Sequence, residues 1–351
     1  MIEPKNLLIV RTDRIGDVVL SLPLAELVKR KYPECKISFL VREYTSCLVQ
    51  NHPFINSHLI LKEKANKTLI FANVQQIRKY NFDSCLIVYP TFHTALIAFL
   101  SGVNNRVGTG YRWYSMLFTH KIFEHRKYAE KHELEYNINL LSAFGINEKV
   151  TPANVNFNLE VSKVSKAKIE NLLAEKKVKS GKPIIIIHPG SGGSAVDLPL
   201  NRFKELVSLI SNHIDAEIIL TGSVSERTLC DKLVVSERIK NFSGLLSLSE
   251  LIALIDKAEL FVANSTGPLH IAAALNKKII GFYPKILSCS AKRWGPYSSK
   301  SKVFVPEINC NNCTREQCEQ LDCMNSIKID KVLSEVQNLI NFEINFGEKN
   351  A

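Results

Sequence analysis

The sequence lacks any apolar run long enough to cross a membrane. A spanning helix needs about 20 consecutive apolar residues, whereas the aliphatic stretches here are short, as around Ile184 to Ile187. Residues 1–5 lead straight into a strand-like segment, without the apolar stretch and cleavage site of a signal peptide. We therefore expect a cytoplasmic location.

Motifs that read nucleic acids are also missing. The formal net charge is +11, and a basic excess attracts nucleic acid, anionic lipid headgroups or a phosphorylated substrate. No motif that reads base edges is recognised, so nucleic acid is the least favoured of these partners. A well-solvated lysine-rich surface explains the charge equally well, because net charge alone does not specify a partner.

The 351 residues are enough for two domains, each with its own core. Short aliphatic strands alternate with amphipathic helices, the lysine-rich stretch 151–182 interrupts them, and the alternation then begins again. This pattern predicts two α/β domains, each a Rossmann-like doubly wound parallel sheet, facing one another across a cleft. The expected boundaries are 1–160, 161–327 and a C-terminal helix and tail at 328–351.

The expected strands are 7–10, 36–41, 84–89, 183–188, 217–221, 260–263 and 279–283. The expected helices are 18–32, 94–100, 165–177, 201–212, 225–233, 249–257, 269–275 and 329–340.

The first motif is Arg11-Thr12-Asp13-Arg14-Ile15-Gly16-Asp17, which follows the first expected strand. Ligands of doubly wound sheets bind at the carboxyl ends of strands. The crowding of two arginines and two aspartates makes Asp13 and Arg14 candidate ligand contacts and Asp17 a candidate general base. The alternative is that Asp17 only caps the following helix.

The second motif, His188-Pro189-Gly190-Ser191-Gly192-Gly193-Ser194, follows another expected strand. Glycines let the backbone approach a ligand, and exposed N–H groups with serine hydroxyls suit phosphate oxygens. The motif is not a Walker A loop, because no Gly-Lys-Ser/Thr ends it. A plain flexible turn is the alternative.

The third motif is Asn264-Ser265-Thr266-Gly267-Pro268-Leu269-His270, where Pro268 fits the first turn of a helix. The N–H groups at such a helix start bind anions, and His270 lies within that turn. Glu226, just after Thr221-Gly222-Ser223, ends another strand and is a candidate for ribose hydroxyls or a simple first-turn acid.

Four of the nine cysteines form the spacing Cys310-x2-Cys313-x4-Cys318-x4-Cys323. Four thiols so close in sequence are candidates for zinc or an iron–sulfur cluster, but the spacing is not the paired C-x2-C of a structural zinc site. Reduced structural thiols, a metal site and disulfides all stay open, with reduced thiols favoured.

Taken together and in this order, the motifs resemble glycosyltransferase family nine, the ADP-heptose:lipopolysaccharide heptosyltransferases. The resemblance covers nearly the whole chain and includes Gly102 and the segment Arg106-Val107-Gly108. It implies a GT-B fold whose N-terminal domain binds a glycan acceptor and whose C-terminal domain binds a nucleotide sugar. It also implies inversion of the anomeric centre without a metal or other cofactor.

Site residues follow from the resemblance one by one. Asp17 matches the acceptor-activating base, with Asp13 and Arg14 beside the acceptor. The implied donor contacts are Gly190 and Ser191 at the phosphates, Glu226 at the ribose, Leu246 at the adenine, and Ser265, Thr266, Gly267 and His270 at the phosphates and sugar.

Two positions depart from the family pattern. Val196 stands where a phosphate-neutralising lysine or arginine is usual, and Ser265 stands where the family has aspartate. Loss of a cation beside a leaving diphosphate removes transition-state stabilisation, unless another residue supplies the charge. The candidates considered from sequence are Arg14, Arg202, Lys292 and Arg293.

The expected activity is therefore transfer of a heptose or related sugar from an ADP-sugar to a lipopolysaccharide-core or other lipid-linked glycan, with peripheral association at the inner membrane. The alternatives are a GT-B transferase or epimerase that uses a UDP- or GDP-sugar, and an inactive nucleotide-sugar-binding module.

Overall fold

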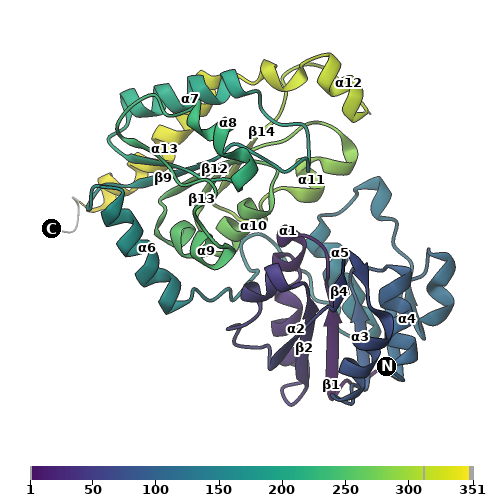
Figure 1. Ribbon diagram of the computed structural model, residues 1–351. Helices are drawn as coiled ribbons and strands as arrows, with labels where there is room; N and C mark the ends of the chain where they lie inside the picture. The colour runs from purple at the N-terminus through teal and green to yellow at the C-terminus, as the bar shows by residue number, and fades with distance from the viewer. Residues whose placement is uncertain (1, 311–312, 348–351) are drawn as a thin grey trace. The chain divides into compact units, whose positions relative to one another are not determined.

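The computed structural model describes residues 2–310 and 313–347, and the chain forms two compact units, Met1–Glu160 and Val161–Ala351 (Figure 1). Each unit contains a six-stranded sheet whose paired strands all run parallel. The predicted α/β class with two Rossmann-like sheets is confirmed.

In the first unit the strand order is β3-β2-β1-β6-β7-β8. The chain moves outward from β1 in one direction, then returns to its other side, which creates a reversal point between β1 and β6. The strands are β1 (Asn6–Val10), β2 (Lys36–Val41), β3 (Ser57–Ile60), β6 (Ser84–Ile87), β7 (Asn105–Thr109) and β8 (His120–Ile122). A small antiparallel hairpin joins β4 (Glu63–Lys64) to β5 (Lys67–Thr68).

One expected helix of the first unit is divided in two, and the helices at Ile70–Arg78 and Glu133–Asn139 were not expected. The expected helix 18–32 is two helices, α1 (Ile15–Val19) and α2 (Pro23–Lys31). Pro23 stands in the first turn of α2, where its missing N–H costs nothing, but it cannot continue a preceding helix. The remaining α-helices are α3 (Ile70–Arg78), α4 (Phe92–Leu100) and α5 (Glu133–Asn139), and the 3₁₀ turns are η1 (Glu43–Leu48), η2 (Trp113–Leu117), η3 (Arg126–Tyr128) and η4 (Leu140–Phe144).

The second unit repeats the strand order, as β11-β10-β9-β12-β13-β14, with its reversal point between β9 and β12. Its strands are β9 (Ile184–His188), β10 (Glu217–Leu220), β11 (Ile239–Asn241), β12 (Leu260–Asn264), β13 (Lys278–Phe282) and β14 (Ser301–Phe304). Sequence inspection missed β3, β7, β8, β11 and β14, because these strands are short or carry polar residues that break the aliphatic pattern.

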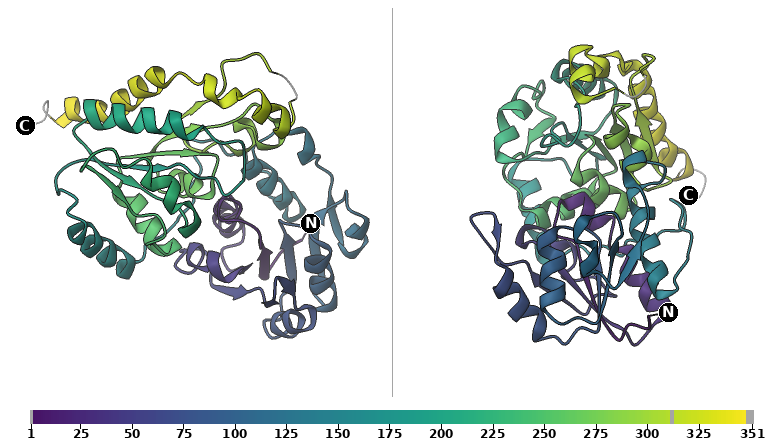
Figure 2. Two further views of the ribbon diagram at one scale, coloured as in Figure 1. Left: turned by 45° about the horizontal axis from the view of Figure 1, so that its top comes forward. Right: turned by 90° about the vertical axis from the view of Figure 1, so that its right-hand side faces the viewer.

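Helices cover the second sheet, and the closing helix α13 (Ile329–Gly347) runs beside α7 (Leu200–His213) (Figure 2). On α13, Val332, Val336 and Ile340 recur every four residues and are buried in the unit's core. The expected helix 225–233 is a 3₁₀ turn, η5 (Val224–Glu226), followed by α8 (Arg227–Asp231). The others are α6 (Lys163–Glu175), α9 (Leu248–Lys257), α10 (Gly267–Ala274), α11 (Ala291–Trp294) and α12 (Arg315–Gln320), with 3₁₀ turns η6 (Leu287–Cys289) and η7 (Cys323–Ser326).

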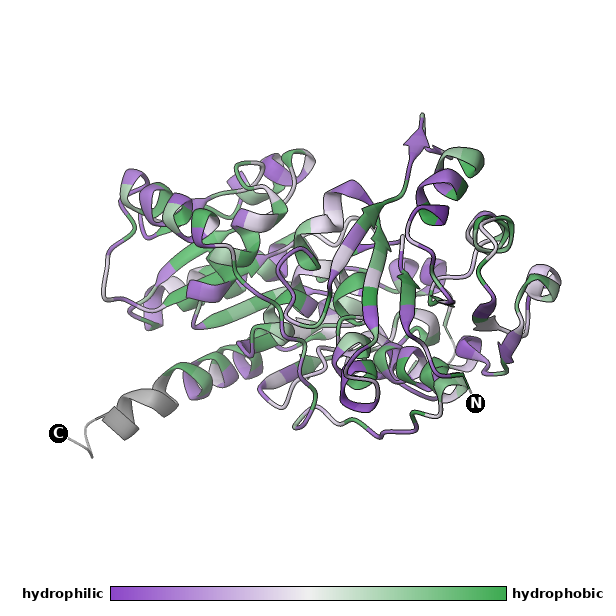
Figure 3. Cartoon of the chain, turned by 90° about the horizontal axis from the view of Figure 1, so that it is seen from below, coloured by the Kyte–Doolittle hydropathy of each residue, from purple (hydrophilic) through white to green (hydrophobic). Residues whose placement is uncertain are grey.

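Hydropathy follows this layering. The strands are largely hydrophobic, whereas the helices change from hydrophobic to hydrophilic around their circumference (Figure 3). None of the helices in residues 2–310 and 313–347 has both the length and the apolar character that a membrane span requires. Because both faces of each sheet are covered, polar chemistry is confined to the loops at the strand ends.

Candidate functional site

The segment Arg11–Gly16 leaves the carboxyl end of β1 at the reversal point of the first sheet. Arg11 is 1% exposed and is surrounded by carboxylates. Its Nε lies 2.8 Å from Asp13 Oδ1, and its Nη2 donates to Asp17 Oδ1 and lies 3.8 Å from Glu133 Oε1. A buried guanidinium is tolerated only with such compensation.

Glu133 at the start of α5 links this cluster to a second arginine. Arg126 donates to Glu133, and Asn137 Oδ1 accepts from both guanidinium groups, at 3.4 Å from Arg11 and 3.3 Å from Arg126. The cluster thus holds three carboxylates and two guanidinium groups. Among these five groups the carboxylates outnumber the guanidinium groups by one.

Asp13 is the carboxylate that carries this imbalance. Burial, together with the negative charge of Asp17, raises the pKa of Asp13 to about 7, although Arg11 acts in the opposite direction. Asp13 therefore holds a proton in a large share of molecules near neutral pH. With Asp13 neutral, the remaining charges balance.

Asp17 lies in the first turn of α1, but it does not cap the helix. The capping position is Arg14, and no side chain makes a cap hydrogen bond there. The Asp17 carboxylate instead accepts from Arg11, and its side chain keeps 14% of its exposure. The structure thus orients Asp17 through a buried guanidinium, in favour of a role beyond capping, while Arg14 is exposed at the start of the helix.

In the second unit, the loop after β9 begins at His188, whose Nδ1 lies 2.9 Å from Thr221 Oγ1. Burial lowers the pKa of His188 to about 4, so it is neutral at physiological pH. Gly192 and Gly193 then adopt φ values of +56° and +77°, and Ser194 N donates to Ser191 O. Two consecutive left-handed residues form a type I′-like turn, which explains the paired glycines.

Glu226 lies between two glycines of neighbouring loops. A Cβ on Gly190 would meet Glu226 Oε1 at 1.8 Å, and one on Gly222 would meet Glu226 Oε2 at 3.2 Å. Glu226 Oε2 accepts from Ser223 N at 2.7 Å and Ser223 Oγ at 2.8 Å. Burial opposes ionisation of Glu226, but the two Ser223 hydrogen bonds, together with the Gly192 N–H, lower its pKa. A side chain at position 190 would therefore displace the Glu226 carboxylate from this arrangement.

Asn264, at the end of β12, joins the two ends of the same loop. Its Oδ1 accepts from Leu198 N at 2.9 Å and its Nδ2 donates to Pro189 O at 2.6 Å. Asn264 is fully buried. It fixes the loop 189–198 at the reversal point between β9 and β12, a role that the sequence did not reveal because the partners lie 66 and 75 residues away.

The third motif lies on the other side of that reversal point. Thr266 precedes α10 without a side-chain cap bond, and Pro268 stands in the first turn. Ser265, Thr266 and His270 are all buried, with at most 8% exposure. Burial raises the pKa of Tyr283 while the Ser265 hydroxyl opposes the shift.

The expected donor residues of the second and third motifs, with Glu226, thus follow adjacent strands of one parallel sheet, whose carboxyl ends lie at the same edge. Leu246 is half-buried in the loop between β11 and α9. Asp13, Arg14 and Asp17 belong to the first unit.

Val196 packs inward against hydrophobic clusters of the second unit. Among the cations considered from sequence, Arg202 is committed elsewhere, because it pairs with Glu205 at 2.6 Å and donates to Ile327 O at 2.8 Å. Arg293 lies over the Trp294 ring. The arginine that bonds to the loop is Arg315, which the sequence analysis did not consider.

The cysteine-rich segment forms a small apolar core. Cys318 and Cys323 are buried with Ile286, and Cys289, Cys310 and Cys313 pack at its border. All nine thiols are free, and burial raises the pKa of Cys318 to about 12, as for an inert structural thiol. Within residues 2–310 and 313–347, no group of three or more His, Cys, Asp or Glu side chains is arranged to hold a metal ion.

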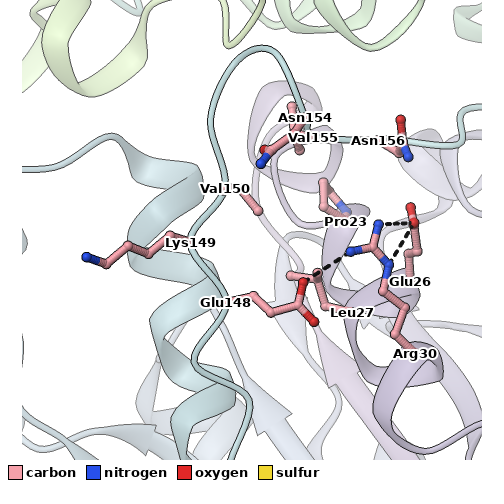
Figure 4. A pocket seen from close by; sticks show the side chains of 10 residues that line it. All are labelled: Pro23, Glu26, Leu27, Arg30, Glu148, Lys149, Val150, Asn154, Val155 and Asn156. Carbon is pink, nitrogen blue, oxygen red and sulfur yellow. Dashed lines mark hydrogen bonds and ion pairs between the residues drawn. The ribbon is translucent and has the colours of Figure 1, made fainter.

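A hollow of about 180 Å³ lies in the first unit between α2 and residues 148–156 (Figure 4). None of its lining residues belongs to the predicted sites. Its charged groups already pair with one another, since Arg30 bridges Glu26 and Glu148. These contacts hold the segment after α5 against α2.

Comparisons with known proteins agree with this geometry. A Haemophilus influenzae protein named as a candidate glycosyltransferase is 30% identical to this chain. The match covers 96% of this chain and 97% of the Haemophilus protein. The solved structure of the Escherichia coli ADP-heptose lipopolysaccharide heptosyltransferase II superposes with a TM-score of 0.78 at 20% identity, covering 96% of this chain and 99% of that one. A glycosyltransferase family 9 structure from Veillonella parvula gives a TM-score of 0.81 at 16% identity, covering 95% and 97%.

These superpositions define the fold as GT-B, as the sequence predicted. The model of glycosyltransferase family 9 (heptosyltransferase) matches residues 70–323. The chain belongs to this family and is a glycosyltransferase.

The first prediction concerns Asp13. Its folded-state pKa of about 7 exceeds the value of roughly 3.9 for an unfolded aspartate. The folded protein therefore keeps a proton that the unfolded chain loses, and it loses stability as pH rises through 7. We expect Asp13→Asn to raise the melting temperature at about pH 8 and to change it much less at about pH 5, measured by thermal unfolding. Glu63→Gln, which removes a surface partner of Arg42, should show no such pH dependence. An equal effect of Asp13→Asn at both pH values would contradict this assignment.

The second prediction concerns Gly190. The methyl of Gly190→Ala would collide with the Glu226 carboxylate, so the side chain must move away from its Ser223 partners. If Glu226 binds the nucleoside, affinity should fall about tenfold or more, the loss expected for hydrogen bonds to a charged group. Titration calorimetry measures this change. In Gly181→Ala the added methyl enters open space, so strain at its positive φ should lower stability without changing affinity.

Proposed function

We propose that the protein transfers a heptose or closely related sugar from an ADP-sugar to a lipopolysaccharide-core or other lipid-linked glycan. Family membership supports sugar transfer, and the similar Escherichia coli enzyme is described as an ADP-heptose lipopolysaccharide heptosyltransferase. The proposal depends on one observation. The two loops that follow β9 and β12, which carry the expected donor residues, leave the sheet at its reversal point, and Glu226 lies beside Gly190 of the first loop.

In the proposed reaction an acceptor hydroxyl attacks the anomeric carbon and the bond to the diphosphate breaks. The nucleoside diphosphate leaves with the electron pair, the configuration inverts, and Asp17 takes the hydroxyl proton. Asp17 suits this role because Arg11 fixes the position of its carboxylate. Asp13, protonated in part near neutral pH, and the exposed Arg14 are proposed acceptor contacts.

On the donor side, we assign the diphosphate to the turn 190–194 and the start of α10. Consecutive N–H groups in a glycine-rich turn and at a helix start favour anions. Gly190, Ser191, Ser265, Thr266, Gly267 and His270 are the proposed contacts. The proposed ribose partner is Glu226, and the half-buried Leu246 is the proposed adenine neighbour. We further propose that the transfer is independent of a metal, as the family resemblance implies.

We also propose peripheral association with the cytoplasmic face of the inner membrane. The segment 111–128 exposes several large apolar side chains, among them Trp113 at 70%, Met116 at 74% and Phe123 at 62%. Exposed Arg112, Lys121 and Lys127 interrupt them. Aromatic side chains favour the membrane interface and cations favour anionic headgroups, which suits an acceptor held in a bilayer.

The third prediction tests Asp17. Asp17→Asn keeps the shape of the side chain but removes its basicity, so turnover should fall by about 100-fold or more. Release of ADP after mixing ADP-heptose with a heptose-deficient lipopolysaccharide core measures turnover, and calorimetry should show unchanged ADP affinity. Glu63→Gln is the matched control, because Glu63 is also a carboxylate of the first unit paired with an arginine.

Full activity of Asp17→Asn would exclude Asp17 as the base. Nucleotide binding by the unaltered protein without turnover on any acceptor would favour an inactive binding module. Preference for UDP or GDP would replace the proposed ADP donor.

The fourth prediction tests the membrane contact. Replacing Trp113 and Met116 with serine should reduce co-sedimentation with phosphatidylglycerol-containing vesicles severalfold, because it removes the two most exposed apolar side chains of the 111–128 segment. Phe71→Ser, which alters a residue 78% exposed on α3, should bind like the unaltered protein. Equal binding of all variants would place the membrane contact elsewhere.

A further inference from the structure

The cysteine-rich segment donates hydrogen bonds to the loop after β9 from the side chain of Arg315. Arg315 is the first residue of α12. Its Nη1 donates to Gly193 O at 3.1 Å and its Nη2 donates to Ala195 O at 3.2 Å. The two terminal nitrogens of the guanidinium thus bind two backbone carbonyls of a loop that lies about 120 residues earlier in the chain.

The Arg315 guanidinium is itself held in position by its own helix. Arg315 Nε donates to Glu319 Oε1 at 2.9 Å, one turn further along α12. The Thr314 side chain caps the same helix by accepting from Gln317 N at 3.3 Å. These contacts orient the guanidinium before any ligand arrives, so little further side-chain entropy is lost when the loop is held.

Apolar packing also holds the loop after β9 against the cysteine-rich segment. Val196 packs against the core formed by Ile286, Cys318 and Cys323. Position 196, where the family commonly places a cation, is therefore used here as an apolar anchor for the cysteine-rich segment. The segment that Val196 anchors is the one that brings Arg315 to the loop.

Arg315 also brings a positive charge close to the loop after β9. Residues 188–199 contain no lysine or arginine, and their acidic residue, Asp197, has its pKa raised to about 6 because burial outweighs the opposing effects of the Ser191 hydroxyl and Arg315. At neutral pH Asp197 is mostly ionised, which disfavours an anionic ligand. The guanidinium of Arg315, which also pairs with Glu319, is a cation whose charge acts on Asp197 and in part offsets it.

We propose that Arg315 is the positioning residue of the donor site, where it holds loop 190–197 in the phosphate-binding conformation and supplies the positive charge absent from position 196. This inference rests on the proposed donor site. Arg315 acts through the loop carbonyls and through its field, and it need not touch the sugar.

Three variants test the proposal by calorimetry with ADP and with adenosine, which lacks the phosphates. Arg315→Gln should weaken ADP binding about tenfold or more, as expected for lost charge-assisted bonds, and leave adenosine binding nearly unchanged. Arg315→Lys keeps the charge without the fork and should recover part of the loss. Arg238→Gln removes another arginine of this unit that pairs at the surface with Asp215, and should bind ADP normally.

Steady-state kinetics then separate positioning from general damage. For Arg315→Gln we expect a raised KM for the donor with a smaller fall in kcat, and an unchanged melting temperature within a few degrees. An equal loss of ADP and adenosine affinity, or no loss of either, would overturn the proposal. If the unaltered protein prefers UDP or GDP, the same comparison is made with that nucleotide and its nucleoside, so failure of the ADP assignment is distinguished from failure of the Arg315 assignment.

Discussion

The reversal of strand order beside the first strand of each sheet decides where this chain can do chemistry. In the first unit it separates β1 from β6, and in the second it separates β9 from β12. Loops that leave neighbouring strands toward opposite faces expose their backbone and side chains to a ligand. Because the strands themselves are buried on both faces, the candidate site residues lie beyond the strand ends, Ser191 in a loop and Asp17 in the first turn of α1.

Each reversal point contains one buried polar side chain that holds the loop in place, and the two differ in charge. In the first unit this residue is Arg11, whose guanidinium orients the carboxylates of Asp13 and Asp17. In the second unit it is Asn264, whose neutral amide joins Pro189 to Leu198. The arginine suits the proposed catalytic role of Asp17, because it orients the carboxylate. The neutral amide suits the proposed binding of anions by the loop N–H groups, since it satisfies the backbone without changing the local charge.

The sequence was sufficient to predict the parallel sheets, because aliphatic strands and amphipathic helices differ in their hydrophobic period. It also located Gly190 in a loop at a strand end and Asp17 just beyond one, near the start of the following helix. It could not distinguish a helix cap from an oriented carboxylate at Asp17, because the decisive partner, Arg11, acts through tertiary geometry. Asn264 and Arg315 escaped notice for the same reason, as their partners lie 66 to 122 residues away. Pattern reading recognises local periodicity, whereas pairing across such distances depends on the complete fold.

At position 196 an apolar side chain takes the place of a cation, and in our proposal another segment supplies the positive charge. A lysine there would bring its own charge to the loop and would need no other segment. A valine contributes burial instead, and the charge comes from Arg315, whose position depends on the packing of Cys318 and Cys323. The conformation of loop 190–197 is then coupled energetically to the folding of residues 313–323, because local opening of that segment would release Gly193 and Ala195 together. Such coupling makes donor affinity sensitive to changes in a small thiol-lined core that contributes no ligand contact of its own.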